Sequence, residues 1–277
     1  MPLAANLYAV DALEITETDE RRWSCDISFI GSLYSDPLYR LPLEKLDEQT
    51  KAEIQHILKE QVGRWDGTVR FINRLSDRAI AALSMTLRED ILDRRLIGDR
   101  SYIEQAFFSR GVSHTERIEA LRRLAGRGRD VRLYTKKEEK DVDLPGVRIA
   151  GTLSYNEELP RAYYLSKINL NLTLPSIRSG VPLRVFDVLA AGGFLLTNYQ
   201  PEMEEFFTIG QDLEVFHSFD EMEDKADYYL RHEKERLQIA LNGHRKVKEK
   251  YTYERIIGII LDMVSEDLVK KGRPRLR

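Results

Sequence analysis

The clearest pattern of hydrophobic and polar positions lies between residues 167 and 199. From 168 to 174, Ile, Leu, Leu and Leu alternate with Asn, Asn and Thr, which is the two-residue period of a strand. Pro175 ends this strand, a loop of residues 176–181 follows, and Pro182 suits a first helical position because no N–H is needed there. Residues 182–191 are expected to form a helix, and Gly192-Gly193 precedes another strand at 194–197. The segment therefore predicts strand, loop, helix and strand.

The same rhythm continues along most of the chain. Further strands are expected at 25–31, 131–134, 147–150 and 213–216, with helices around 118–124, 156–166, 218–230, 233–250 and 253–269. Strands that alternate with helices predict a parallel sheet covered by helices on both faces. The loops after Gly31, Gly151 and Leu174 should then share the sheet edge at which ligands of such folds bind.

One region departs from this alternation. Residues 36–110 carry helical spacing with almost no strand signal, with helices expected at 42–63, 69–75, 79–96 and 103–108. We therefore predict an extended lead-in of residues 1–22, a Rossmann-like α/β domain of residues 23–35 and 111–277, and an α-helical insertion of residues 36–110.

The loop before the 182–191 helix is the strongest candidate for chemistry. Its residues include Ser176, Arg178, Ser179 and Gly180. A helix start directs unpaired N–H groups at such a loop and favours an anion. Arg178 and Arg184 flank the opening, and Asp187, one turn in, could accept hydrogen bonds from sugar hydroxyls. An ordinary strand-to-helix connection is the alternative, but two arginines and an acid favour a nucleotide diphosphate.

Two asparagines interrupt the preceding strand. Asn169 and Asn171 stand where a central strand is normally apolar. Polar side chains there need partners, which either neighbouring protein groups or a ligand cleft would provide. We count Asn171, together with Gly31 at the end of the first strand, among the candidate donor-binding residues.

Composition limits the class of protein. Hydrophobic residues make up 42% and charged residues 32%, as in ordinary soluble proteins, and a net charge of −3 argues against a general nucleic-acid binder. A lone cysteine, Cys25, fits a reducing compartment. The sequence has no long apolar run and no secretory leader, so we predict a cytoplasmic protein without a transmembrane segment.

Long stretches of the sequence resemble a known family. The run SKINLNLTLPSIRSGVPLRVFDVLAAGGFLLTNYQPEMEEFF, followed by YYLRHEKERLQIALNGHRKVKEKYTYERI, is similar to the C-terminal half of bacterial family-1-type glycosyltransferases of the spore-maturation (CgeB-like) group. CDISFIGSLY, TERIEALRRL and VRLYT are similar to that family's opening strand, first helix and second strand. The resemblance covers residues 24–34 and 111–260. It implies a GT-B architecture, in which two Rossmann-like domains face each other and the C-terminal one binds a nucleotide sugar.

The resemblance also implies roles for individual residues. Gly180 and its loop would approach the diphosphate, and Arg184 would neutralise phosphate charge. Asp187 stands where the family usually has glutamate and would hold the ribose hydroxyls. Gly151 to Tyr155 would lie against the base, and Arg117 would be a phosphate-facing cation at the start of the first helix.

Metal binding has little support in the sequence. Asp141-Val-Asp143 matches the two-acid pattern with which some glycosyltransferases hold a divalent ion, but such short matches are frequent by chance. The five histidines are scattered without ligand spacing. We therefore expect no metal and no cofactor apart from the nucleotide-sugar substrate.

These inferences predict the donor-binding half of a glycosyltransferase that moves a sugar from a UDP-sugar to an unidentified glycan or protein acceptor, with retention by family analogy. A full acceptor-binding domain is expected before such a half, so the chain looks like a fragment or one half of a split enzyme. Two alternatives remain open. One is a nucleotide-sugar epimerase on the same scaffold, and the other is a non-catalytic interaction module that binds a partner through the helical insertion.

Overall fold

The centre of the molecule is one parallel sheet. The computed structural model describes the chain except for residues 1–2, 36–42, 88–98, 140–141 and 271–277. The strands are β1 (Cys25–Ile30), β2 (Val131–Tyr134), β3 (Val147–Ala150), β4 (Ser166–Asn171), β5 (Leu195–Asn198) and β6 (Glu214–Phe216). Every neighbouring pair is parallel, in the order β3-β2-β1-β4-β5-β6. The strand order reverses between β1 and β4, so this is a doubly wound, Rossmann-like α/β fold, as predicted.

Helices cover both faces of the sheet. One core unites the sheet with α6 (Ser109–Ala125) and α10 (Phe219–Arg231), and the other unites it with α7 (Glu158–Leu165) and α8 (Leu183–Ala190). The long helix α11 (Glu233–Lys250) contributes to both cores, through Ile239 to the first and Val247 to the second. The short α9 (Met203–Phe206) packs with the second core.

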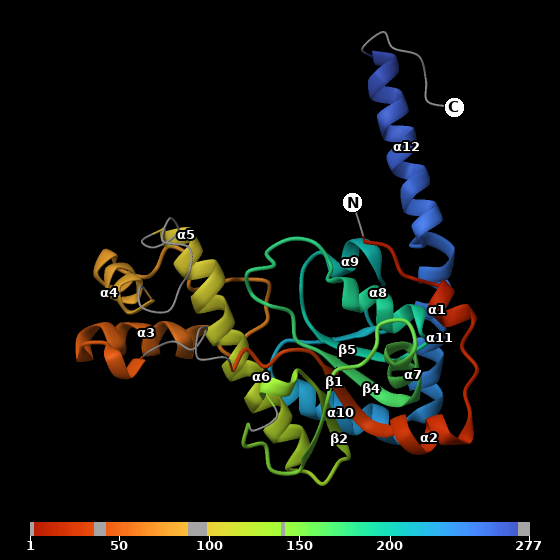
Figure 1. Cartoon of the computed structure of the whole chain (residues 1–277), viewed down its shortest axis with the longest axis horizontal. Coiled ribbons are helices and arrows are strands. Elements are labelled where there is room, and N and C mark those ends of the chain that lie inside the picture. Colours follow the sequence, from red (N-terminus) through yellow and green to blue (C-terminus); the bar gives the residue numbers. More distant parts are fainter. Residues whose placement is uncertain (1–2, 36–42, 88–98, 140–141, 271–277) are drawn as a thin grey trace.

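The helical block lies to one side of the sheet (Figure 1). It consists of a 3-10 turn (Leu43–Lys45), α3 (Glu48–Gln61), α4 (Asp77–Leu87), α5 (Arg100–Tyr102) and a π-helical turn (Ile103–Phe108). Its side chains form a separate hydrophobic cluster. The π-helical turn continues directly into α6, so the expected domain boundary at residue 110 falls inside a shared helical segment. The division into domains stays a prediction.

The lead-in contains helices that the sequence analysis did not expect. Residues 1–22 were expected to be extended, but α1 (Tyr8–Asp11) and α2 (Glu17–Trp23) lie there. Thr16 starts α2 with a capping box: its hydroxyl accepts from the Asp19 N–H, and the Asp19 carboxylate accepts from the Thr16 N–H. This cap stabilises a helix that has no long apolar period.

The expected helix at 69–75 was wrong, because this segment forms turns. Asn73 has φ 59°, a left-handed conformation that a right-handed helix excludes. Its N–H donates to the Glu104 carboxylate at 3.0 Å. The predicted helix at 79–96 corresponds to α4 as far as Leu87, and residues 88–96 lie outside the described part of the chain.

The segment around α8 has the predicted order with shifted bounds. The strand ends at Asn171 instead of Leu174, because the Thr173 N–H donates to the Asn198 side chain at 2.7 Å. Pro182 is the N-cap of α8, with ψ 145°, and is not its first helical residue.

The last helix, α12 (Tyr253–Lys270), projects from the body of the molecule (Figure 1). Among the described residues, no helix combines the length and the apolar character needed to cross a membrane.

Candidate functional site

A cavity opens where β1 and β2 end and α8 begins. Its volume is about 440 Å³, and its lining includes Gly31, Thr135, Tyr155, Arg184 and Asp187. The strand order reverses beside β1, and ligands of open α/β sheets bind beyond the carboxyl ends of the strands at such a point. The cavity therefore occupies the position that the fold offers to a ligand.

Arg184 links α8 to the end of β1. Its guanidinium donates to the Ile30 carbonyl, while its Nε is buried without a partner. A Cβ atom on Gly31 would lie 2.8 Å from Arg184 Nη1, so glycine leaves room for this guanidinium. Pro182 provides no side-chain cap, so no capping side chain occupies the N–H groups at the start of α8. A cation and a helix start thus meet at one wall of the cavity.

Arg117 lies behind the same loop. It is buried on α6 and donates to the carbonyls of Ser32 and Leu172, the latter at 2.7 Å. Burial, and further the positive charge of Arg184, lower the pKa of Arg117. Among the described residues, neither arginine forms an ion pair with a carboxylate. The absence of a direct ion pair at Arg184, which lines the cavity, favours a bound anion there.

Asp187 faces the cavity one turn after Arg184. Burial raises the pKa of Asp187 to about 6, although the hydrogen bond from Tyr155 and the charge of Arg184 act to lower it. The Tyr155 hydroxyl donates to Asp187 Oδ1 at 3.0 Å. Tyr155 belongs to the loop after β3, so this bond joins that loop to α8 at the mouth of the cavity.

Glu139 is a residue that the sequence analysis missed. Its carboxylate accepts from Ser32 Oγ at 2.8 Å, from the N–H groups of Leu33 and Ser35 at 2.7 and 3.2 Å, and from the Thr135 hydroxyl. Burial acts to raise the pKa of Glu139, but these hydrogen bonds outweigh it and lower the pKa. Glu139 therefore fixes the loop after β1. It stands in a charged stretch without periodicity, so no sequence signal separated it from solvated neighbours.

The structure brings together only some of the predicted site residues. Gly31, Tyr155, Arg184 and Asp187 line the cavity; Gly151 directly precedes Thr152, which also lines it; and Arg117 contacts its loop through Ser32. The remaining loop residues are not part of this lining. The Ser176 N–H donates to Ser109 Oγ at 2.9 Å, Ser179 and Gly180 are exposed, and Arg178 lines a different cavity. The roles of all these residues in donor binding stay predictions.

The two strand asparagines have protein partners. Asn169 accepts from Ser28 Oγ and donates to the Tyr163 carbonyl, both at 2.9 Å. Asn171, predicted as a donor-binding residue, is buried, and its amide donates to Thr173 Oγ1 and Thr197 Oγ1 at 3.1 and 2.9 Å. Neighbouring protein groups therefore satisfy both side chains.

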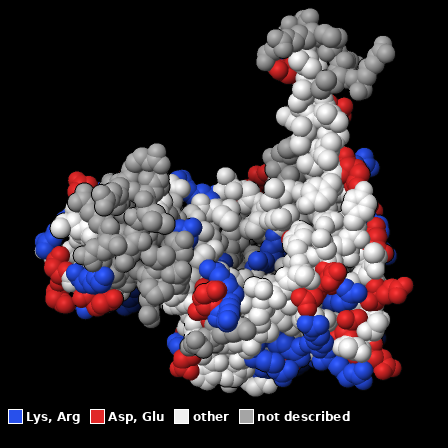
Figure 2. Space-filling view, in the orientation of Figure 1, with Lys and Arg blue, Asp and Glu red and all other residues white. Residues whose placement is uncertain are grey.

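The distribution of surface charge is consistent with an anion-binding site. Figure 2 shows lysine and arginine side chains at the walls of a hollow near the middle of the displayed face.

Within the described ranges, no three His, Cys, Asp or Glu side chains are grouped as a metal site. Asp141 of the two-acid pattern lies outside those ranges.

Comparisons with known proteins point to one family. The family model described as glycosyl transferase-like matches residues 114–262. The chain is similar to the structure of Anabaena Alr3699/HepE in complex with UDP and glucose, with a TM-score of 0.51 and 10% identity over 94% of this chain and 55% of that one. It is also similar to a glycosyltransferase from Rickettsia africae ESF-5, with a TM-score of 0.51 and 11% identity over 96% of this chain and 56% of that one. The chain thus spans little more than half of these two proteins. A search of curated proteins returned no match.

Proposed function

The chain belongs to the glycosyl transferase-like family, and on this premise we propose that it is the donor-binding half of a GT-B glycosyltransferase that uses a nucleotide sugar, specifically a UDP-sugar. We further propose membership of the bacterial CgeB-like group, a cytoplasmic location, transfer with retention, and an acceptor-binding domain as partner. The acceptor is a glycan or a protein.

One observation carries this proposal: the Arg184 guanidinium, which forms no ion pair among the described residues, and a helix start without a side-chain cap meet at a cavity of about 440 Å³ that also exposes a carboxylate, with Arg117 buried behind its loop. The cations and the helix start suit a diphosphate, and Asp187 suits the ribose hydroxyls. A helix N-terminus contributes roughly 0.3–1 kcal/mol to anion binding, or ~2 when partly buried. Each charge-assisted hydrogen bond adds about 1.5–3 kcal/mol. A few such contacts reach the ~8 kcal/mol of micromolar affinity.

The same groups account for catalysis. As the bond between the sugar and the phosphate oxygen breaks, negative charge accumulates on the leaving diphosphate. Arg184 and the start of α8 would stabilise this charge, because both border the cavity and the helix start has no side-chain cap. This route needs neither a protein nucleophile nor a metal ion.

The test is calorimetric titration of the chain with UDP and UDP-glucose, with and without Mg²⁺. We expect micromolar binding that does not depend on the metal, and its loss in Arg184→Ala. The matched control is Arg245→Ala, which removes an exposed guanidinium from α11. An absence of binding at millimolar UDP, or a strict requirement for a divalent ion, would overturn the proposal. Recovery of epimerised donor in the absence of acceptor would favour the epimerase instead.

A further inference from the structure

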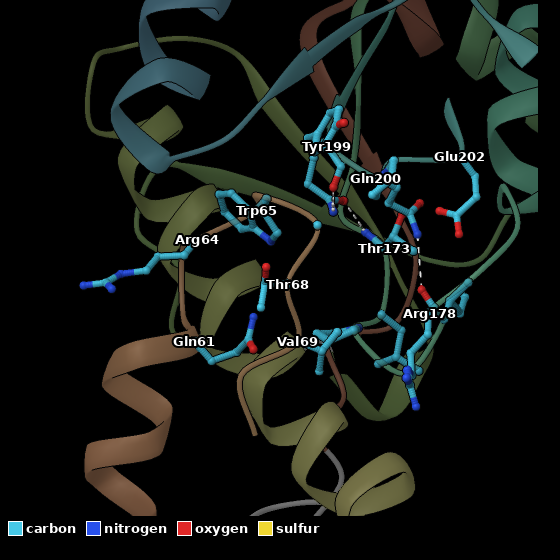
Figure 3. A pocket seen from close by; sticks show the side chains of 16 residues that line it. Gln61, Arg64, Trp65, Thr68, Val69, Thr173, Arg178, Tyr199, Gln200 and Glu202 are labelled. Atoms are coloured by element: carbon cyan, nitrogen blue, oxygen red, sulfur yellow. Dashed lines mark hydrogen bonds between the residues drawn. The ribbon is translucent and has the colours of Figure 1, made fainter. Parts of the chain in front are cut away.

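A second cavity lies on the same edge of the sheet, between the helical block and the ends of β4 and β5. Its volume is about 60 Å³. Figure 3 shows Gln61, Trp65, Thr68 and Val69 on one side of it and Thr173, Arg178, Tyr199 and Gln200 on the other. The first wall comes from residues 61–69, which connect α3 to the rest of the helical block. We call this space the insertion cavity.

Close backbone packing closes the insertion cavity at Gly67. This residue has φ +82°, and a Cβ atom there would lie 2.7 Å from Pro201 Cγ. The segment 61–69 therefore packs directly against the loop after β5. The backbone N–H of Trp65 also donates to the His217 carbonyl at 3.0 Å, which fixes this wall to the loop after β6.

Three polar side-chain atoms of lining residues are buried without a hydrogen-bond partner: the acceptors Gln200 Oε1 and Glu202 Oε2, and the donor Trp65 Nε1. The Gln200 side chain is buried, with 7% of its surface exposed, and Nε2 donates to the Ile177 carbonyl at 3.3 Å. This contact sets the orientation of the amide, because a carbonyl cannot bond to Oε1. Gln200 Oε1 and Glu202 Oε2 are both buried without a partner, and both residues line the cavity. An unpaired buried acceptor costs about 1–3 kcal/mol, so a ligand that donates to both atoms recovers that free energy.

The lining narrows the class of ligand. Two of the free atoms are acceptors and one, Trp65 Nε1, is a donor, so the ligand must both donate and accept hydrogen bonds, as hydroxyl groups do and an ammonium group does not. Arg178 also lines the cavity and has no carboxylate partner among the described residues, and its charge opposes a second cation. The space exceeds what one water molecule needs, and the rings of Trp65 and Tyr199 border it. Neutral hydroxyl groups carried on carbon fit these conditions.

We propose that the insertion cavity binds hydroxyl groups of a saccharide, which belongs either to the transferred sugar of the donor or to the acceptor. The assignment to donor or acceptor rests on the proposed transferase function, whereas saccharide binding itself does not. The helical block then acts as a part of substrate recognition, because it supplies one wall of the cavity.

Trp65 gives the experiment its own signal. The chain has two tryptophans, so Trp23→Phe leaves Trp65, whose ring packs edge-on against Phe216 at 5.0 Å, as the only indole. Its fluorescence is followed during titration with methyl α-glucoside, methyl β-galactoside, methyl N-acetyl-β-glucosaminide, UDP and UDP-glucose. We expect a saturable emission change. A response to a methyl glycoside identifies an acceptor sugar, and a response to UDP-glucose that UDP does not produce identifies the donor sugar.

Variants of the two acceptors complete the test. In the same background, Glu202→Gln and Gln200→Leu should each weaken the saccharide response about tenfold, as expected for one lost hydrogen bond of ~1.4 kcal/mol. The control Glu205→Gln changes an exposed carboxylate nearby and should leave the response unchanged. UDP affinity, measured by calorimetry, should be unchanged in all three variants.

Two results would overturn the inference. One is an unchanged emission with every saccharide at the limit of solubility, which would leave the insertion cavity to ordered water only. The other is an emission response that Glu202→Gln and Gln200→Leu do not weaken. UDP binding is measured separately, so the two proposals can fail independently. UDP binding without saccharide binding would contradict only this inference, and saccharide binding without UDP binding would contradict only the proposed donor site.

Discussion

The two cavities on the carboxyl edge of the sheet differ in the groups that they offer to a ligand. The cavity at α8 presents the guanidinium of Arg184 and the uncapped start of a helix, which are donors. The insertion cavity has two unpaired acceptors, Gln200 Oε1 and Glu202 Oε2, and one unpaired donor, Trp65 Nε1. A diphosphate satisfies the first set and is repelled by the acceptors of the second, whereas neutral hydroxyl groups satisfy the second. The unpaired polar groups of the two cavities therefore favour different ligands along one edge of the sheet, an anion in the α8 cavity and a polyol in the insertion cavity.

The two cavities also differ in the part of the chain that builds them. The α8 cavity is bordered by strands and loops of the sheet together with α8, and most of its lining lies within the region matched by the family model. The insertion cavity needs residues 61–69, which lie outside that region. If both proposals hold, donor binding depends mostly on the region that the family model matches, and saccharide recognition also depends on residues outside it.

The largest expected effect comes from Arg184→Ala. The variant removes a cation from the α8 cavity and should weaken UDP binding at least 100-fold, because two charge-assisted contacts of about 1.5 kcal/mol each are lost. Calorimetry measures this loss. The response of Trp65 to methyl glycosides should stay unchanged in the same variant. A parallel loss of both signals would break the comparison, since it would mean that the two cavities form one site.

The next effect concerns the loop after β1. Glu139→Gln keeps the shape of the side chain but replaces one of two carboxylate oxygens that accept from Ser32, Leu33, Ser35 and Thr135. We expect a loss of about 2 kcal/mol in the free energy of unfolding, measured by urea denaturation at pH 7. The control Glu138→Gln changes the preceding, exposed residue. Equal stability of the two variants would contradict the anchoring role of Glu139.

The third effect is a pH dependence at Asp187. Its pKa is raised to about 6, so the carboxylate gains a proton, and loses an acceptor, as the pH falls through 6. Affinity for UDP-glucose should fall about tenfold between pH 7.5 and 5. UDP-glucose is the suitable probe because its phosphates are both esterified and do not titrate near pH 6. Asp187→Asn should bind weakly at both pH values, and a wild-type profile without a step near pH 6 would remove Asp187 from the site.

The same raised pKa has the opposite consequence for stability. The folded state binds the proton of Asp187 more tightly than the unfolded state, so the ionised group lowers the free energy of unfolding above pH 6, and this cost disappears below about pH 4. Asp187→Asn should therefore raise stability at pH 7 by about 1–2 kcal/mol and have no such effect at pH 4. Thermal unfolding at the two pH values measures this difference. A stability gain that is equal at both would contradict the burial of a charge.

Much of the fold could be predicted from the sequence because its strands carry their own pattern. The period of two in 168–174 and the short apolar runs of β2 and β3 gave elements in the right order. Side-chain hydrogen bonds set the details that were missed. Thr16 caps a helix in the lead-in, Asn73 breaks one in the helical block, and Asn198 draws Thr173 away from β4. Each depends on a contact that periodicity does not contain.

The candidate site shows the same limit. Arg184 and Asp187 could be identified from the sequence because they lie in the helix that directly follows the candidate loop. The structure places both in the lining of the α8 cavity. Arg178 belongs to that loop but lines the insertion cavity and not the α8 cavity. Gln200 and Glu202 had no sequence signal at all, since their importance comes from residues 61–69 packing against them.

The smallest effect is expected at Gly67, where a substitution tests how residues 61–69 pack against the loop after β5. Gly67→Ala places a methyl group in a left-handed backbone position and against the Pro201 ring. Gly128→Ala is the matched control, because its φ of +73° is similar and a Cβ atom there meets nothing within 4 Å. The backbone cost, about 1 kcal/mol, should be common to both variants and lower the melting temperature by about 2–4 °C. Only Gly67→Ala should also weaken the saccharide response of Trp65, because only there must the wall of the insertion cavity move. If the two variants retain the same saccharide affinity, contact between the helical block and the loop after β5 does not shape the insertion cavity. The difference between the two cavities would then come only from the acceptors in the loop after β5.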